Sequence, residues 1–321
     1  MLLLTKADME AVFTMREAFD AVREAFTLYT AGQSQVPLRS SIDIPQQQAQ
    51  ALFMPAYAGG ALGIKIVGLF PNNRAVGMPV TPATMLLFDE NNGALLCMMD
   101  GAFLTQTRTA AAAGLATELL ASPGAEVAAL IGLGGQAPCQ FNALLEAAPT
   151  LREVRVFDLD SKRKQQFADE RSGSRVRVLS ADTADQAVSG AHIVTTVTTA
   201  TAPVFSYGCV APGMHINAIG SFTHDMQELP EQLIASCDLL VFDTVHGVMS
   251  ESGDILKPLE KGMLGGKGLD IEMGHVLAGA FKRKTAQEVT VYKSVGSGVL
   301  DVVTAAAIYK KAIQAGLGQK L

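Results

Sequence analysis

The sequence of 321 residues predicts an α/β protein in which a doubly wound parallel sheet is joined to an α+β region. Three observations support this fold class. From about Glu126 onward, apolar runs typical of buried strands alternate with helical segments, and a glycine-rich turn follows the first of these runs. Before that point, short β-like runs are separated by Pro, Gly and Asn, which is typical of an antiparallel or mixed sheet.

The first part of the chain is predicted to form two helices, a sheet and a third helix. Apolar residues recur at helical spacing between Thr5 and Tyr29, which indicates an amphipathic helix pair. The turn sequence Asn91-Asn92-Gly93 predicts a β-hairpin, and an alanine-rich helix is predicted from Thr105 to Leu120. The expected strands lie at residues 38–43, 50–54, 62–68, 84–89 and 94–99.

The glycine-rich turn is the most informative segment. The apolar run Val127–Ile131 leads into Gly132-Leu133-Gly134-Gly135-Gln136-Ala137, which has the G-x-G-x-x-A form of a dinucleotide-binding turn. The first glycine permits the tight turn, the second lets backbone N–H groups approach a pyrophosphate, and the alanine lets the helix pack closely. The phosphates would lie at the positive end of that helix. We therefore expect the cofactor to be bound by Gly132, Gly134, Gly135, Gln136 and Ala137.

An acidic residue follows the next strand. The run Glu153–Phe157 reads as a buried strand and ends in Asp158. A carboxylate at this place accepts hydrogen bonds from the adenosine ribose and repels a 2′-phosphate, which favours NAD(H). Lys162 and Arg163 follow closely and can reach a 2′-phosphate, so NADP(H) remains an alternative.

Later strand ends are expected at the same carboxyl edge, where ligands bind in open α/β sheets. Thr198 follows one strand, and Gly220 and Ser221 follow the next, so we expect all three near the cofactor. A threonine-rich strand without a binding role is the alternative for the first. His224 and Asp225 are either a proton-transfer pair or turn and capping residues. The later strands are expected at residues 175–179, 192–196, 215–218, 239–243 and 288–292, before a helix at 299–315.

Three basic residues stand out in the first region, which is otherwise poor in charge. They are Arg39, Lys65 within an apolar strand, and Arg108 at the start of the alanine-rich helix. Burial of an unpaired ammonium is costly, so Lys65 needs a partner or a ligand. Each residue alone is readily explained as a salt-bridged or snorkelling base. Together they predict an anion pocket in which the arginines hold a carboxylate and Lys65 faces the reacting carbon.

Composition narrows the class of protein. The net charge of −6 argues against a nucleic-acid footprint and against anionic membrane surfaces. The four cysteines have no C-x-x-C spacing, so we expect no metal site. A hydrophobic content of 49% with 17% charged residues indicates apolar surface covered by a partner subunit. With no signal peptide or membrane span expected, the cytoplasm is the expected compartment.

Several short motifs are spread along the whole chain. They are Gly63–Lys65, Leu104–Ala111, the Gly132 turn, Gly213–Ser221, Glu251–Ile255 and Lys293–Gly296. By this set of motifs the chain resembles the ornithine cyclodeaminase/mu-crystallin family over essentially its whole length. The resemblance implies a homodimer with a discontinuous α+β substrate and dimerisation domain, residues 1–118 plus 299–321, around a Rossmann domain at residues 119–298. It also implies that Arg39, Lys65 and Arg108 bind the substrate, with Lys65 and Arg108 polarising the reacting centre.

Two departures from the family pattern bear on the activity. Cyclodeaminases and archaeal alanine dehydrogenases carry a proton-accepting aspartate at the position aligned with Phe222, and residues 50–54 lack the acid that meets the ornithine amine. We therefore expect an NAD(P)H-dependent oxidoreductase of proline metabolism, a ketimine reductase converting Δ1-pyrroline-2-carboxylate or Δ1-piperideine-2-carboxylate to L-proline or L-pipecolate. The alternatives are ornithine cyclodeaminase, alanine dehydrogenase, and a protein that binds NAD(P)H or a small ligand without turnover.

Overall fold

The structure is a computed structural model that describes residues 1–321, apart from the side chain of Arg74. The chain divides into two compact units. Unit 1 consists of Met1–Arg108 and Ser297–Leu321, and unit 2 of Thr109–Gly296. The first boundary therefore lies ten residues before the expected position, inside a continuous helix. The turn-forming residues Ser122-Pro123-Gly124 follow the end of that helix, so the unit boundary does not coincide with this turn.

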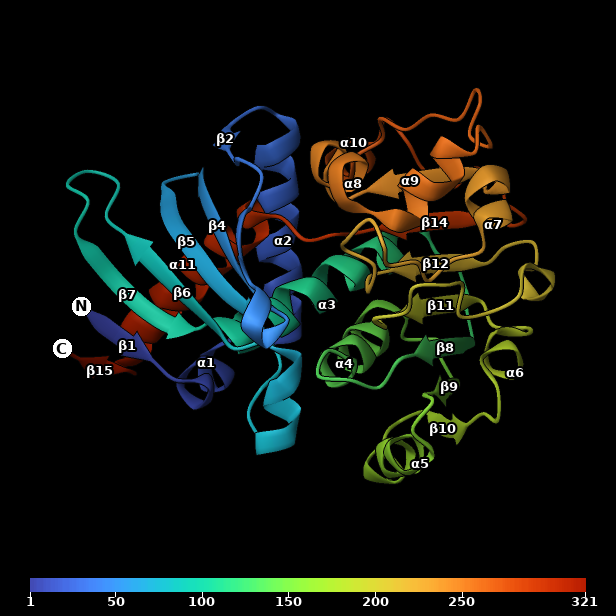
Figure 1. Ribbon diagram of the computed structural model, residues 1–321, viewed down its shortest axis with the longest axis horizontal. Coiled ribbons are helices and arrows are strands. Elements are labelled where there is room, and N and C mark those ends of the chain that lie inside the picture. The colour runs from blue at the N-terminus through green and yellow to red at the C-terminus, as the bar shows by residue number, and fades with distance from the viewer. The chain divides into compact units, whose positions relative to one another are not determined.

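Unit 1 is a mixed sheet with helices. Its sheet order is β15-β1-β7-β6-β5-β4-β2, with β3 paired to β4, and the two chain ends lie side by side because β1 pairs with β15 (Figure 1). The predicted strands and hairpin are confirmed. The elements are β1 (Leu2–Leu4), α1 (Lys6–Val12), α2 (Met15–Thr30), β2 (Ser34–Gln35), β3 (Ser40–Ile44), β4 (Ala49–Ala58), β5 (Ala61–Leu69), β6 (Ala83–Phe88), β7 (Leu95–Asp100), α3 (Gly101–Leu120), α11 (Gly298–Ala315) and β15 (Gln319–Lys320).

Local sequence explains where the helices of unit 1 begin. Thr14 caps α2 in a capping box, because its hydroxyl accepts from the Glu17 N–H group and the Glu17 carboxylate accepts from the Thr14 N–H group. Asp100 accepts a hydrogen bond of 2.8 Å from the Phe103 N–H group. Helix α3 therefore starts at Gly101, four residues before the predicted start at Thr105, because the prediction overlooked this acidic cap.

The register of the sheet separates a buried face from a half-buried one. Lys65 pairs with Met54 and with Met85, and all three side chains are buried. The preceding residue of β5, Ile64, points to the other face and is half-buried. Helix α11 packs against β4, β5 and β6, as well as against α2. The prediction that the terminal helix returns to the first region of the chain is thus confirmed.

Unit 2 is a parallel sheet with the strand order β10-β9-β8-β11-β12-β14-β13. The order reverses beside β8, as in doubly wound dinucleotide-binding sheets, so the predicted fold class is confirmed. Its elements are β8 (Val127–Ile131), α4 (Ala137–Ala147), β9 (Glu153–Phe157), α5 (Ser161–Glu170), β10 (Arg177–Ser180), α6 (Ala184–Val188), β11 (Ile193–Thr196), β12 (His215–Ala218), α7 (Glu231–Ser236), β13 (Leu239–Phe242), α8 (Val245–Glu251), α9 (Gly253–Glu260), α10 (Met273–Leu277) and β14 (Thr290–Lys293).

Apolar clusters cover both faces of this parallel sheet. Ala128 and Leu130 of β8 pack with Phe141 and Phe167 from α4 and α5. The alternate residues Ala129 and Ile131 belong to the other cluster, which α6 and α7 help to enclose. Burial on both faces explains why these strands read as continuous apolar runs. Figure 1 shows α4 and α5 on one side of the strands and α6 on the other.

Candidate functional site

The cation predicted to need a partner has one. Lys65 is 1% exposed, and its Nζ atom lies 2.9 Å from Oδ1 and 2.8 Å from Oδ2 of Asp301 in α11. Arg108, in the second turn of α3, donates from Nε to Oδ1 of the same carboxylate at 2.9 Å. A single buried aspartate therefore brings together two of the three predicted cations.

Asp301 was absent from the sequence-based set of site residues. It is fully buried and lies among the buried apolar residues Val299, Leu300 and Val302 in the first turns of α11. That placement was the available signal, because an isolated acid among buried apolar residues requires a cation. The sequence did not reveal which cation.

Burial and charge act on both members of this ion pair. Burial, aided by the nearby charges of Arg108 and Arg39, lowers the pKa of Lys65 to about 7, although Asp301 acts in the opposite direction. Burial alone would raise the pKa of Asp301, but Lys65 and Arg108 together lower it below its usual value. Asp301 is therefore ionised, and the Lys65 proton is easily lost.

Arg39 belongs to the same region of unit 1. It directly precedes β3, whose first residue Ser40 pairs with Phe53, the neighbour of Met54. Met54 in turn pairs with Lys65. The charge of Arg39 lowers the pKa of Lys65, which is consistent with this placement. Arg39 is half-buried, so its side chain is accessible from solvent.

The glycine turn of unit 2 has the features that a dinucleotide needs. Gly132 has φ +93°, a conformation that only glycine adopts readily, and a β-carbon there would lie 2.7 Å from Cγ2 of Thr198. Gly134 and Gly135 are exposed, and a β-carbon at Gly134 would meet no described atom within 4 Å. Ala137 is fully buried where α4 begins. The surface of the turn is therefore open to a phosphate group.

An unsatisfied polar atom lies at the same turn. The Oε1 atom of Gln136 is buried and has no hydrogen-bond partner among the described residues. Buried polar atoms are usually hydrogen-bonded, so a missing partner indicates a place for a ligand or a water molecule. The residues of this turn fit a bound dinucleotide.

Asp158 lies directly beside this turn. Its Oδ2 atom accepts a hydrogen bond of 2.8 Å from the Leu133 N–H group, and Arg163 Nη1 lies 3.3 Å from both carboxylate oxygens. Lys162 is exposed, and the backbone N–H groups of both basic residues bind Asp160 at the start of α5. The Asp158 carboxylate and the Arg163 guanidinium are therefore in contact at the end of β9, where the adenosine ribose is expected.

The later strand ends meet at one buried carboxylate. The backbone N–H groups of Thr198, Gly220 and Ser221 donate to Glu228 at 2.5, 2.7 and 3.2 Å. These N–H groups therefore point at Glu228, and only the other atoms of the three residues can face a cofactor. Sequence reasoning missed Glu228, which is followed by Leu229 and Pro230 and looks like an ordinary loop acid.

His224 and Asp225 do not form a close pair. His224 Nε2 lies 2.8 Å from Glu260 Oε1, whereas its Nδ1 atom lies 3.8 Å from Asp225 Oδ1. The contact with Glu260 raises the pKa of His224, and both residues are exposed. Phe222, two residues earlier, packs against an apolar cluster of unit 2.

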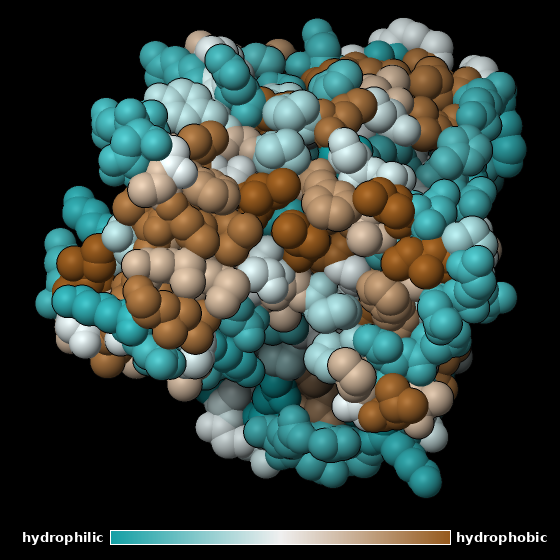
Figure 2. Space-filling model, turned by 60° about the vertical axis from the view of Figure 1, so that its left-hand side comes forward, coloured by the Kyte–Doolittle hydropathy of each residue, from teal (hydrophilic) through white to brown (hydrophobic). Residues whose placement is uncertain are grey.

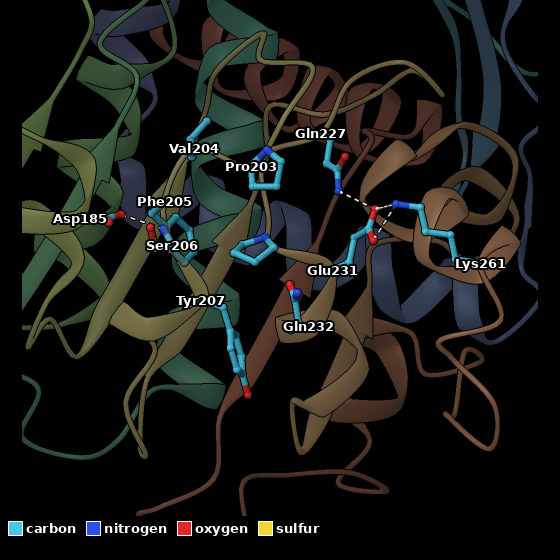
Figure 3. Close-up of a pocket in the computed structure, with 11 residues that line it drawn as sticks. Asp185, Pro203, Val204, Phe205, Ser206, Tyr207, Gln227, Glu231, Gln232 and Lys261 are labelled. Atoms are coloured by element: carbon cyan, nitrogen blue, oxygen red, sulfur yellow. Dashed lines mark hydrogen bonds and ion pairs between the residues drawn. The ribbon is translucent and has the colours of Figure 1, made fainter.

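A surface pocket of about 640 Å³ lies elsewhere in unit 2 (Figure 3). In it, Glu231 points toward Lys261, with which it forms an ion pair of 2.7 Å. Its described lining residues include none of the predicted site residues. They are Asp185, Pro203, Val204, Phe205, Ser206, Tyr207, Gln227, Pro230, Glu231, Gln232 and Lys261.

Two classes of site are not found in the part of the chain that the structure describes. Its His, Cys, Asp and Glu side chains form no group of three or more that could hold a metal ion. None of the described helices combines the length and apolar character needed to cross a membrane.

Comparisons with known proteins agree with the geometry of both units. The model of the ornithine cyclodeaminase/mu-crystallin family matches residues 1–316. A Delta(1)-pyrroline-2-carboxylate reductase of Bacillus cereus is 32% identical over 330 residues, which cover 100% of this chain and 99% of that protein.

Two solved structures share the whole fold. The Delta(1)-pyrroline-2-carboxylate reductase of Thermococcus litoralis, in complex with NADH and L-proline, has a TM-score of 0.95 and 35% identity and covers 100% of both chains. An archaeal alanine dehydrogenase dimer with bound NAD has a TM-score of 0.93 and 30% identity, over 100% of this chain and 98% of that chain. The resemblance inferred from the motifs is confirmed, and the chain belongs to the ornithine cyclodeaminase/mu-crystallin family.

Proposed function

We propose that the protein is an NAD(P)H-dependent reductase of small cyclic imino acids. Its substrates are Δ1-pyrroline-2-carboxylate and Δ1-piperideine-2-carboxylate, and its products are L-proline and L-pipecolate. The observation that carries this proposal is the convergence of Lys65 and Arg108 on the buried Asp301 in unit 1. Unit 2 supplies the glycine turn for the nucleotide. The reductases among its relatives support the same reaction.

The cations of unit 1 have separate tasks in this proposal. Arg108 contacts Asp301 through Nε, and its Nη groups carry further donors suited to bidentate binding of a carboxylate. Arg39 provides a second guanidinium for the same carboxylate. Lys65 places positive charge beside the imine, where Asp301 fixes its position. Such fixed positioning removes part of the entropic barrier of the reaction.

The proton balance of the reduction explains why no proton-accepting aspartate is required at position 222, where this chain has Phe222. When bound, NAD(P)H supplies the hydride that adds to the C=N carbon. A protonated ketimine already carries the proton that the ring nitrogen keeps in the secondary amine. Cyclodeamination and alanine oxidation instead need a group that accepts a proton, and the aromatic ring of Phe222 cannot accept one.

NAD(H) is the preferred cofactor in this proposal, and NADP(H) is the alternative. In this proposal the Asp158 carboxylate, which accepts from the Leu133 N–H group, also accepts hydrogen bonds from the ribose hydroxyls. Arg163 already contacts Asp158, so its guanidinium is close to the position of a 2′-phosphate. The two structural relatives bind NADH and NAD.

We also propose that the protein is a homodimer. Antiparallel pairing places Ile64 beside Pro55 and Leu86, and Leu86 beside Met98, in a row of half-buried apolar side chains on the sheet of unit 1. Figure 2 brings the left-hand side of Figure 1 forward and shows hydrophobic residues gathered on the surface there. An apolar sheet face of this kind is suited to a second copy of the chain. The archaeal relative is a dimer.

The direct test is oxidation of NADH and of NADPH in the presence of the two cyclic imines. Turnover with at least one imine, and formation of the corresponding L-amino acid, is the expected result. Ammonia release from ornithine without net NADH formation would instead identify a cyclodeaminase, and NADH formation from alanine an alanine dehydrogenase. Nucleotide binding with no turnover of any of these compounds would make the protein a binding protein.

A further inference from the structure

A fully buried carboxylate accepts hydrogen bonds from residues at the carboxyl ends of two strands of unit 2. This is the edge of the sheet where the dinucleotide is proposed to bind. Glu228 is 0% exposed and accepts hydrogen bonds from the backbone N–H groups of Thr198, Gly220 and Ser221. It also accepts from the hydroxyl of Thr196 at 3.0 Å. These donors lie at or just after the carboxyl ends of β11, which pairs with β8, and of β12, which pairs with β11.

Close backbone packing extends this contact to the glycine turn. A β-carbon at Gly220 would overlap the backbone of Thr198 and lie 2.6 Å from Oε1 of Glu228. Thr198 in turn touches the turn itself, because a β-carbon at Gly132 would lie 2.7 Å from its Cγ2 atom. The oxygens of Glu228 therefore join the carboxyl ends of β11 and β12, and the packing of Thr198 on Gly132 extends this contact to the end of β8.

A buried salt bridge fixes Glu228 in turn. Asp254 Oδ1 accepts from the N–H groups of Glu228 and Leu229 at 2.7 and 2.9 Å. Asp254 Oδ2 lies 3.0 Å from Nζ of Lys293, at the end of β14, and both side chains are 0% exposed. Burial and the charge of Asp254 raise the pKa of Glu228, while Lys293 and the Thr198 N–H group act in the opposite direction. Its four donors hydrogen-bond best to an ionised carboxylate.

We propose that Glu228 is a positioning residue for the nicotinamide dinucleotide. In parallel α/β sheets a dinucleotide lies across the carboxyl ends of the strands on either side of the switch point, which are the ends that Glu228 connects. The carboxylate keeps Thr198, Gly220 and Ser221 in register with the glycine turn without itself reaching the surface. This inference rests on the proposed use of a nicotinamide cofactor and adds a residue that determines affinity for it.

The test is the variant Glu228→Gln, which keeps the volume but points an amide NH₂ group at backbone donors. The Kd of NADH, measured by quenching of its fluorescence, and the KM of NADH are both expected to rise by at least about tenfold. The KM of the imine and the fold by circular dichroism are expected to stay unchanged. A general loss of structure would not produce this split between the two KM values.

The matched control is Glu153→Gln. Glu153 is also a buried carboxylate of unit 2, but it lies at the amino end of β9 and pairs with Arg155 and Arg177. Its loss is expected to lower stability and to leave the Kd of NADH unchanged. An NADH affinity of Glu228→Gln equal to that of the wild type overturns the inference and leaves the proposed reductase intact. A wild-type protein that binds neither nucleotide overturns both.

Should Glu228→Gln fail to fold, Thr196→Val tests the same contact more mildly. It removes one donor to Glu228 and keeps the shape of the side chain. A smaller rise in the Kd of NADH is expected, without a change in the KM of the imine. An unchanged Kd in the folded Thr196→Val protein contradicts the inference.

Discussion

Lys65 and Asp301, which lie 236 residues apart in the chain, form an ion pair of 2.8 Å in which both side chains are buried. Asp301 also binds Arg108, so one carboxylate neutralises part of the charge of two cations. A substrate carboxylate can therefore still be attracted to the excess positive charge, and Asp301 prevents the two cations from separating. The site thus depends on a helix from one end of the chain and a strand from the other.

Asp301→Asn should destabilise the protein, because it leaves Lys65 and Arg108 buried without their counter-charge. Removal of one partner from a buried ion pair costs about 3–5 kcal/mol, and we expect a loss of this size in the free energy of unfolding. Urea titration followed by circular dichroism measures it. Asp8→Asn, in an exposed capping box of α1, is the control and should cost about 1 kcal/mol or less. Equal effects of the two variants would contradict a central role for Asp301.

Lys65→Ala should abolish most turnover and spare the nucleotide site. We expect kcat/KM for the imine to fall by roughly 100-fold or more, because a fixed charge at the reacting centre is lost. The Kd of NADH should change by less than about twofold, since the glycine turn belongs to unit 2. Stopped-flow NADH oxidation and fluorescence titration give the two numbers. Lys6→Ala, on the surface of unit 1, serves as the control. Full activity of Lys65→Ala would exclude its proposed task.

Turnover should decline as the pH rises through about 7, because burial lowers the pKa of Lys65 to about 7 and the proposed task requires its charged form. A plot of log kcat/KM against pH at saturating NADH should bend near that value. Lys65→Arg keeps its charge throughout this range, so the bend should be absent from its profile. A bend that persists in Lys65→Arg must come from the imine or from another group.

The same pKa predicts a change in stability. Between pH about 7 and 10.5 the unfolded chain keeps the Lys65 proton that the folded protein has lost. The contribution of Lys65 to the free energy of unfolding therefore rises with pH across this window and is constant below it. Denaturant titrations of the wild type and of Lys65→Arg at several pH values isolate this contribution.

Asp158→Asn should change the choice of nucleotide. It keeps a hydrogen-bond acceptor for the Leu133 N–H group. It removes the charge that, in the proposed function, repels a 2′-phosphate and binds the ribose. We expect the KM of NADH to rise by about tenfold, since charge-assisted hydrogen bonds contribute about 1.5–3 kcal/mol. The KM of NADPH should fall. Asp160→Asn keeps the cap of α5 and is the control. Arg163→Ala in the Asp158→Asn background should reverse the gain for NADPH.

Ile64→Glu should separate the proposed dimer. A charge on the half-buried apolar row of unit 1 opposes burial against a second copy of the chain. Size-exclusion chromatography with light scattering should show the mass of one chain for this variant and of two chains for the wild type. Leu159→Glu, at a side chain 94% exposed in unit 2, should leave the mass unchanged. A monomeric wild type would refute the dimer.

The sequence by itself determined the parallel sheet, the glycine turn and the three cations. These features are local, because a strand, a turn with positive φ and a helix each leave a short pattern of residue types. Gly132, Ala137 and Asp158 were predicted as cofactor-binding residues for this reason. The relation of Lys65 to a partner was also visible, since an ammonium in an apolar strand cannot remain unpaired.

Only the tertiary structure decided which partners these residues have. Asp301 pairs with Lys65, 236 residues away in the sequence, and Glu228 accepts hydrogen bonds from separate loops. A local sequence pattern cannot predict contacts between residues so far apart in the chain. Folding brings α11 against β5 and places the ends of β11 and β12 around one carboxylate. In a low-dielectric interior each buried charge must be met by whatever the fold places beside it, so three-dimensional packing selects the partners.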